Sequence, residues 1–220
     1  MYLTRMYLNA RRRSAVRLLA SPQRMHAAVM VSFPPVDDDD VQGRTLWRID
    51  RQGDRTALIV ASAREPDMSC LVEQAGWQTG EMWQTRSYGP LLESLCAGQV
   101  WAFRLTANPT YAGRREGWSD TKPRAHTTVG QQEQWFKSRC GGWGFAIPNG
   151  DDDSPEFHVA ERDTLRFRRG GGHVVLATAT YEGLLEVTDP ELLRRALTAG
   201  IGRAKAYGCG LLTLAPAGRP

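Results

Sequence analysis

The pattern of hydrophobic and polar positions at the start of the chain predicts a strand followed by a helix. Residues 1–8 carry strand formers, and a helix is expected over residues 22–32. Ser21 is a good N-cap, and Pro22 suits the first helical position. Helical spacing predicts that the core face of this helix consists of Met25, Ala28, Val29 and Ser32.

A hairpin and two shorter elements are predicted next. Side chains alternate over residues 44–50, a turn follows at 51–54, and a second strand is expected over 55–62. The alternation sets Thr45, Trp47 and Ile49 against Arg44, Leu46 and Arg48. A short helix capped by Asp67 and a weak strand over 81–87 complete the order βαββαβ.

The same order of elements is predicted again from Val100 onwards. The strands that flank Gly170-Gly171-Gly172 form a second hairpin, and Asp189 and Pro190 begin a helix that Gly200 closes. The predicted elements are a strand over 100–107, a helix from Thr128 to Cys140, strands over 156–169 and 173–187, a helix over 190–199 and a strand over 211–214.

Two βαββαβ units predict an α+β fold of two ferredoxin-like, RRM-like halves, each an antiparallel sheet with helices on one face. We expect an N-terminal domain over 1–95 and a C-terminal domain over 99–220. One face of each sheet is left without helices. Two such faces form a cleft, and sheets of this kind often bind RNA.

Composition narrows the class of protein. The 220 residues are 41% hydrophobic and 24% charged, as in ordinary folded domains. The longest apolar run, Ala57 to Ala61, is too short to cross a bilayer, and the apolar stretch after Arg11-Arg12-Arg13 is too short for a signal peptide. The four cysteines show no metal-ligand spacing, so we expect free thiols in a cytoplasmic protein without a metal or another cofactor.

The basic residues favour arginine strongly. The net charge is +4, and only three of the 28 basic residues are lysines, namely Lys122, Lys137 and Lys205. Arginine binds phosphates with its planar fork and stacks on bases, so a nucleic-acid partner is one reading. Codon bias towards arginine is the other.

A glycine-rich stretch near the C-terminus is the strongest local signal. Gly200, Gly202, Gly208 and Gly210 enclose Arg203 and Lys205. It follows a helix and precedes a strand, so it matches neither a Rossmann loop nor a P-loop. Exposed amides beside two cations suit a phosphate. A purely structural glycine turn is the alternative.

Two arginine-rich segments are candidates for RNA binding. In the hairpin over 161–173, alternation sends Leu165 and Phe167 to one face, with Arg169 near the tip. Such a hairpin can read guanine edges, or it is a charged edge strand that resists aggregation. The other segment is a loop over 111–124, expected to be mobile, which either orders on a phosphate backbone or stays solvated. The arginines on the opposite hairpin face are Arg162, Arg166 and Arg168, and the cations of the loop are Arg114, Arg115, Lys122 and Arg124.

His26 is the candidate catalytic residue. It lies about 100° from the core stripe of the helix over 22–32, on a face with Gln23 and Met30, and is expected to be partly exposed. Histidine titrates near neutral pH, and RNA is cleaved when its 2′-hydroxyl is deprotonated and the leaving oxygen is protonated. The other three histidines are expected to be structural or surface groups.

Several motifs together resemble the CasE family, the CRISPR-associated endoribonucleases of the type I-E Cascade complex. The closing pattern Gly-x-Gly-x-x-Lys-x-x-Gly-x-Gly-Leu-Leu-x-Leu-Ala-Pro, over 200–216, is the most specific. The others are Met1-Tyr2-Leu3-Thr4-Arg5, Met25-His26, Leu46-Trp47-Arg48, Phe103 to Pro109 and Tyr181-Glu182-Gly183.

The resemblance implies a protein that binds the CRISPR repeat hairpin, cuts precursor CRISPR RNA at its 3′ base without a metal, and leaves a 2′,3′-cyclic phosphate. It also implies that the protein stays bound with other Cascade subunits; in isolation we expect a monomer. His26 takes the place of the family's catalytic histidine. The arginine hairpin takes the place of its major-groove reader.

One departure from the family pattern stands at Gln23, where well-studied members have a tyrosine. Glutamine cannot shuttle a proton, so Gln23 could only orient groups. Arg24 and Lys205 are candidates to assist His26, and the stand-in tyrosines are Tyr2, Tyr7 and Tyr207. A non-catalytic RNA-binding subunit is therefore the alternative reading. A module for a protein or small-molecule partner is a third.

Overall fold

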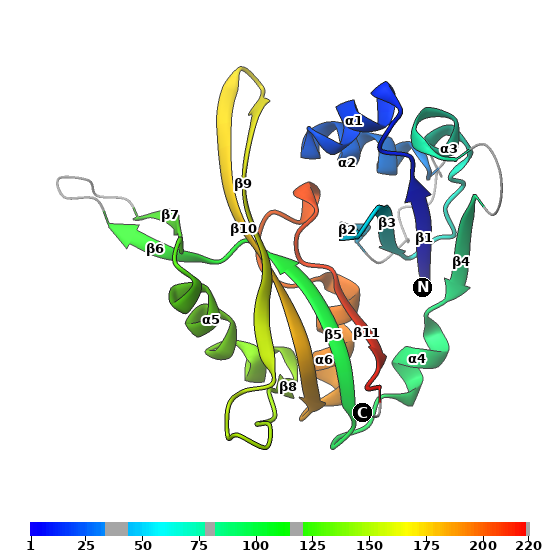
Figure 1. The fold of residues 1–220 in the computed structure, drawn as a ribbon. Coiled ribbons are helices and arrows are strands. Elements are labelled where there is room, and N and C mark those ends of the chain that lie inside the picture. Colours follow the sequence, from blue (N-terminus) through cyan, green and yellow to red (C-terminus); the bar gives the residue numbers. More distant parts are fainter. Residues whose placement is uncertain (34–43, 78–81, 115–120, 219–220) are drawn as a thin grey trace.

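The computed structural model describes residues 1–33, 44–77, 82–114 and 121–218. Figure 1 shows two antiparallel sheets, one from each half of the chain, lying side by side and joined through the short helix α4 (Gly89–Ser94). This arrangement is the tandem ferredoxin-like fold that the order of elements predicted. The boundary between domains at residues 95–99 stays a prediction.

The first sheet has the strand order β2-β3-β1-β4. Read from the β4 edge, the order is β4-β1-β3-β2, so the four strands of the βαββαβ unit lie in the order 4-1-3-2. Its helices pack together and against the strands, around a core that includes Met6, Val29 and Leu58. The elements are β1 (Tyr2–Leu8), α1 (Arg13–Leu19), α2 (Pro22–Val31), β2 (Leu46–Gln52), β3 (Arg55–Ser62), α3 (Ser69–Ala75) and β4 (Trp83–Ser87).

The second sheet repeats this order, with β11, β5 and β10 side by side and β9 and the short β8 both paired with β10. Its core includes Phe103, Phe136 and Tyr181. The elements are β5 (Val100–Ala107), β6 (Thr110–Arg114), β7 (Thr121–Ala125), α5 (Val129–Lys137), η1 (Cys140–Trp143), β8 (Phe145–Ala146), β9 (Phe157–Arg169), β10 (Gly172–Val187), α6 (Pro190–Ala199), η2 (Lys205–Tyr207) and β11 (Leu212–Pro216).

Several elements differ from the sequence prediction. The helix α1 precedes α2 as a separate element, and α4 forms the connection between the halves. Segments 110–114 and 121–125, expected as a mobile loop, pair as the antiparallel strands β6 and β7. The helix α3 begins at Ser69, and Asp67 Oδ1 accepts a hydrogen bond from its backbone N–H at 2.9 Å.

The strand β2 is buried on both faces, which its alternating pattern did not predict. Trp47 faces the helices of its own domain. On the other face, Leu46 packs with Leu211 of the second half, and Arg48 is only 2% exposed. The second half of the chain therefore covers part of the open face of the first sheet, and β2 lies at the contact between them.

Candidate functional site

His26 lies on α2 at the edge of the core. The helix begins as the sequence predicted, since the Ser21 hydroxyl accepts a hydrogen bond from the Arg24 backbone N–H at 3.4 Å. Met25 and Val29 are buried in the core. His26 is one position beyond Met25, which turns it about 100° away from the core, and it is half-buried as expected.

A pocket of about 370 Å³ opens in front of His26. Its wall draws on α2, the segment that leads into β2, the end of β3 and the helix η2 of the second half. Arg44 brings a positive charge to this pocket, and burial, followed by this charge, lowers the pKa of His26 below its usual value. The described residues that line it are His26, Met30, Phe33, Arg44, Thr45, Ala63, Arg64 and Ala206.

Trp47 is the hydrogen-bond partner of His26. Its indole Nε1–H donates to Nδ1 of the imidazole, with 3.3 Å between the nitrogens. Trp47 is 3% exposed and extends from β2, so the bond joins a rigid strand to the neighbouring helix. Neither Trp47 nor Arg44 was a candidate in the sequence, because spacing along the chain says nothing about which strand meets α2.

The glycine-rich stretch packs against β2. All four of its candidate glycines have positive φ, between 72° and 89°. A Cβ on Gly200 would lie 2.7 Å from a methyl carbon of Leu46, and one on Gly208 would lie 2.9 Å from the Trp47 ring. Gly210 packs as closely on the backbone of Ile201. These contacts give Gly200, Gly208 and Gly210 a packing role, which the sequence left open beside a phosphate-binding one.

The two cations of the glycine-rich stretch lie apart. Lys205 Nζ donates to the Ala199 carbonyl at 2.7 Å, and burial, followed by the charge of Arg44, lowers its pKa. Lys205 is thus close to the His26 pocket. Arg203 is exposed and lines a different pocket, with Tyr111 and Arg139. The roles of both in RNA binding stay predictions.

The other candidates for assisting His26 do not line its pocket. Gln23 and Arg24 lie on α2 but are exposed to solvent. Among the described residues of this pocket there is no tyrosine. Tyr207 packs on Phe167, with 4.8 Å between the ring centroids, while Tyr2 and Tyr7 lie half-buried on β1.

The hairpin of β9 and β10 confirms the predicted alternation and extends beside the N-terminal helices (Figure 1). Phe167 is buried against Tyr207 and Cys209, whereas Arg166 and Arg168 are exposed. The side chain of Arg169 lies outside the described part of the structure. Two exposed arginines at the spacing of alternate strand positions can approach a phosphate backbone or a groove.

Arg162, in the same hairpin, is hydrogen-bonded to other residues of the protein. Its Nε donates to Gln132 Oε1 at 3.0 Å, and its Nη2 donates to the Thr127 carbonyl. It therefore ties β9 to the start of α5. To bind RNA as predicted, Arg162 would have to exchange these two hydrogen bonds for contacts with the RNA.

The β6–β7 hairpin carries the remaining basic candidates. Arg124 is exposed, and its stem lies against Gly113 on the paired strand. The side chains of Arg114 and Lys122 and the whole of Arg115 lie outside the described residues. The predicted contribution of this segment to RNA binding stays a prediction.

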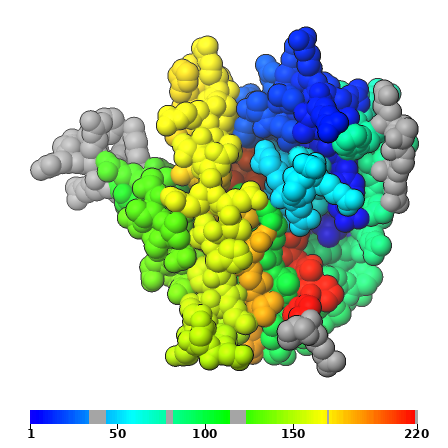
Figure 2. Space-filling model, in the orientation of Figure 1, coloured from blue at the N-terminus to red at the C-terminus, as the bar shows by residue number. Residues whose placement is uncertain are grey.

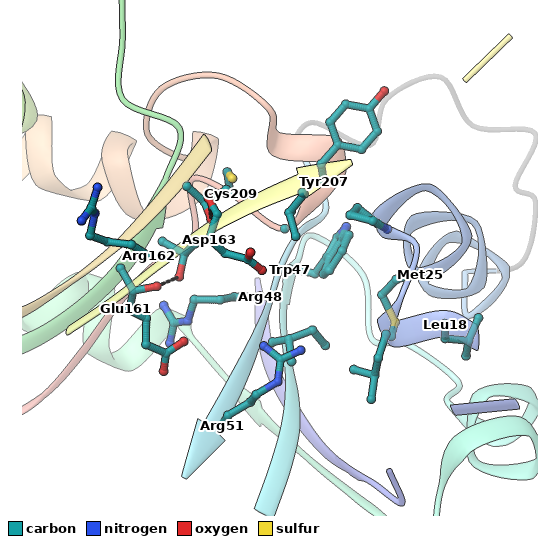
Figure 3. Close-up of a pocket in the computed structure, with 18 residues that line it drawn as sticks. Leu18, Met25, Trp47, Arg48, Arg51, Glu161, Arg162, Asp163, Tyr207 and Cys209 are labelled. Carbon is teal, nitrogen blue, oxygen red and sulfur yellow. Dashed lines mark hydrogen bonds between the residues drawn. The ribbon is translucent and has the colours of Figure 1, made fainter. Parts of the chain in front are cut away.

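A second pocket, of about 360 Å³, separates the arginine hairpin from the N-terminal helices. Figure 2 shows the surface hollowed between these two parts. In Figure 3, Leu18, Met25 and Trp47 form one wall, and Glu161 and Asp163 of β9 form the other. The sequence predicted a cleft between two open sheet faces. The observed pocket differs, because one of its sides is formed by the helices α1 and α2 together with β2.

The described ranges hold neither a cluster of metal-ligating side chains nor a membrane-spanning helix. No three histidine, cysteine, aspartate or glutamate side chains in the described ranges gather closely enough to hold a metal ion. Within the same ranges, no helix is long and apolar enough to cross a membrane. The four cysteines are free, and burial raises the pKa values of Cys140 and Cys209 to about 12.

Known proteins resemble the chain over almost its whole length. A family model described as CRISPR associated protein matches residues 1–216. The CRISPR-associated endoribonuclease Cse3 of Thermus thermophilus is 31% identical, over 98% of this chain and 100% of that protein. A structure of CRISPR endoribonuclease Cse3 bound to a 19-nucleotide RNA has a TM-score of 0.82 at 30% identity, covering 98% of this chain and 100% of that one. A chain of a CRISPR RNA-guided surveillance complex, 20% identical, shares the fold with a TM-score of 0.65, over 98% of this chain and 100% of that one.

Proposed function

Because the chain belongs to the family of CRISPR-associated proteins, we propose that it is an endoribonuclease that cleaves precursor CRISPR RNA at the 3′ base of the repeat hairpin. The observation that carries this proposal is the similarity to the endoribonuclease Cse3 from end to end, at 31% identity. The same fold holds a 19-nucleotide RNA in that relative, which supports RNA as the substrate.

The reaction we propose is an internal transesterification. The 2′-oxygen attacks the adjacent phosphorus, a P–O2′ bond forms, and the P–O5′ bond breaks. The 2′-oxygen loses its proton and the 5′-oxygen gains one, so the products are a 2′,3′-cyclic phosphate and a 5′-hydroxyl. We propose that His26 contacts the reacting oxygens. Arg44 and Lys205 are proposed to stabilise the negative charge that accumulates on the phosphate.

Binding and chemistry are assigned to different surfaces. The exposed Arg166 and Arg168 of the β9–β10 hairpin are proposed to hold the RNA stem, while His26 lies on α2 in the first half. We also propose that the protein acts without a metal ion in the cytoplasm, as a monomer in isolation. After cleavage it would keep the hairpin as a subunit of Cascade.

The test is cleavage of the organism's own CRISPR repeat RNA by purified protein, with and without EDTA, followed by mapping of the product ends. We expect one cut at the 3′ base of the hairpin, unaffected by EDTA, with a cyclic phosphate on the 5′ fragment. His26→Ala should abolish the cut and leave RNA binding nearly intact. The matched control is His158→Ala, an exposed histidine on β9 outside the pocket.

A non-catalytic hairpin-binding subunit is the second candidate, and Gln23 is the observation that favours it. Family members that are well studied carry a tyrosine there, and the described residues of the His26 pocket include none. Tight binding of the repeat RNA with no cleavage under any condition would establish this alternative. Cleavage by His26→Ala at the wild-type rate would contradict the assignment of His26.

A further inference from the structure

The bond between Trp47 and His26 fixes which imidazole nitrogen holds the proton. The indole Nε1–H is a donor only, and it points at Nδ1 of His26 from 3.3 Å. Nδ1 must therefore offer its lone pair. A neutral imidazole carries one proton, so the proton lies on Nε2, and Nε2–H is the group left for a substrate.

Packing leaves the Trp47 ring little room to turn away. Its ring faces Gly208 so closely that a Cβ at that position would lie 2.9 Å and 3.1 Å from two carbons of the six-membered ring. The preceding Leu46 lies against Gly200 in the same way. The indole is thus held between α2 and the glycine-rich stretch, and its N–H stays directed at the imidazole.

The charged groups around His26 favour the same protonation state. Arg44 and Arg64 line its pocket, and Lys205 lies on the adjoining η2. All three are cations, and the described residues of the pocket include no carboxylate that would stabilise an imidazolium. Burial adds to this effect, and the pKa of His26 is lowered.

From this geometry we propose that Trp47 is a positioning residue, which holds His26 as the neutral tautomer with Nε2–H directed to the RNA. The inference rests on the proposed function and makes it more specific. His26 would act as a hydrogen-bond donor to the oxygen that gains charge as the P–O5′ bond breaks. Neutral histidine acts as an electrophile in this manner in other enzymes.

The protons balance without a net change on His26. Nε2 already holds a proton, so it cannot accept the one that leaves the 2′-oxygen, and water is the acceptor that we assign. Water also supplies the proton that the 5′-oxygen finally takes up. This division of roles is consistent with a site in which Gln23 replaces the family's tyrosine. With water as the proton acceptor, neither His26 nor Gln23 has to act as the base.

The first experiment observes the tautomer directly. Two-bond proton–nitrogen NMR spectra of the ¹⁵N-labelled free protein distinguish protonated from unprotonated ring nitrogens, and loss of one signal set in His26→Ala assigns His26 among the four histidines. We expect Nε2 protonated and Nδ1 unprotonated at neutral pH. A protonated Nδ1 in the wild-type protein would overturn the proposal whatever its cleavage activity.

The second experiment removes the donor and keeps the ring. Trp47→Phe should give a mixture of tautomers, raise the pKa of His26, and slow single-turnover cleavage about 10- to 100-fold, by analogy with metal-bound histidines that lose their orienting partner. The NMR titration midpoint of His26 should move to higher pH. The control is Trp83→Phe, a half-buried tryptophan of the same domain that packs on the core away from His26.

The outcomes distinguish the positioning role of Trp47 from the proposed catalytic role of His26. An unchanged tautomer and an unchanged pKa of His26 in Trp47→Phe would refute the positioning role even if His26→Ala abolishes cleavage. A changed tautomer in Trp47→Phe, together with normal cleavage by His26→Ala, would refute the assignment of His26 to catalysis and leave the structural effect of Trp47 established.

Discussion

Arg48→Ala should weaken the contact between the two halves of the molecule. The guanidinium is 2% exposed and extends from β2 into the second half. It donates to the carbonyls of Arg104 and Leu211, both at 2.8 Å, and to the hydroxyl of Thr213 at 2.9 Å. Both oxygens of Asp50 also accept from it, at 2.6 and 2.8 Å, and hold it in place.

The cost of this substitution follows from the groups that it leaves behind. Each hydrogen bond to a charged group contributes about 1.5–3 kcal/mol, and three of them cross between the halves. Their sum overestimates the loss, because Asp50 keeps a second partner in Arg104 Nε at 3.1 Å. We therefore take about 3–5 kcal/mol, the usual cost of breaking a buried ion pair. For a chain of this size, this corresponds to a fall in Tm of about 6–20 °C.

Urea unfolding followed by tryptophan fluorescence and by circular dichroism measures this effect. In the variant we also expect the two probes to separate into two transitions, because the halves lose the bonds that make them unfold together. Arg51→Ala is the control: this exposed arginine lies three positions further along β2, on the opposite face, and its loss should change stability by less than about 0.5 kcal/mol. A loss below about 1 kcal/mol in Arg48→Ala would refute this account of the interface.

Three further predictions concern the site. Gly208→Ala places a Cβ at a φ of +82° against a buried ring, so we expect a loss of about 1–3 kcal/mol in urea unfolding, and wild-type stability would contradict the packing role. Arg166→Ala should weaken binding of the repeat hairpin by about 1–3 kcal/mol and reduce its salt dependence in filter-binding titrations. Arg162→Ala should do so less, because its guanidinium already has protein partners; equal losses would refute the distinction. Arg44→Gln removes a charge that lowers the pKa of His26, so NMR titration should show a higher pKa, and an unchanged pKa would contradict the electrostatic role of Arg44.

The sequence predicted the fold well because its signals are local. Ser21 with Pro22, and Asp189 with Pro190, mark helix starts that the structure confirms. The triple glycine after Arg169 joins two long alternating segments, which do form a hairpin. The strands 110–114 and 121–125 were missed because their sequence alternates weakly and is rich in polar residues.

The site was predicted less completely, because it depends on contacts between distant segments. His26 could be found from its helix face and the family resemblance. Its partner Trp47 lies 21 residues away, and its pocket includes Ala206 from the other half of the chain. The alternation of β2 placed Arg48 on the face opposite Trp47. It did not predict that Arg48 is buried, because its partners lie in the second half of the chain.

The glycine-rich stretch connects these observations. A cradle for phosphate would keep its amides open to solvent, whereas here Gly200 and Gly208 lie under β2 and are needed because no side chain fits. The same strand sends Arg48 into the second half and Trp47 to His26. A change in this stretch would therefore alter both the contact between the halves and the orientation of the imidazole. Gly200 and Gly208 therefore influence the proposed chemistry through packing.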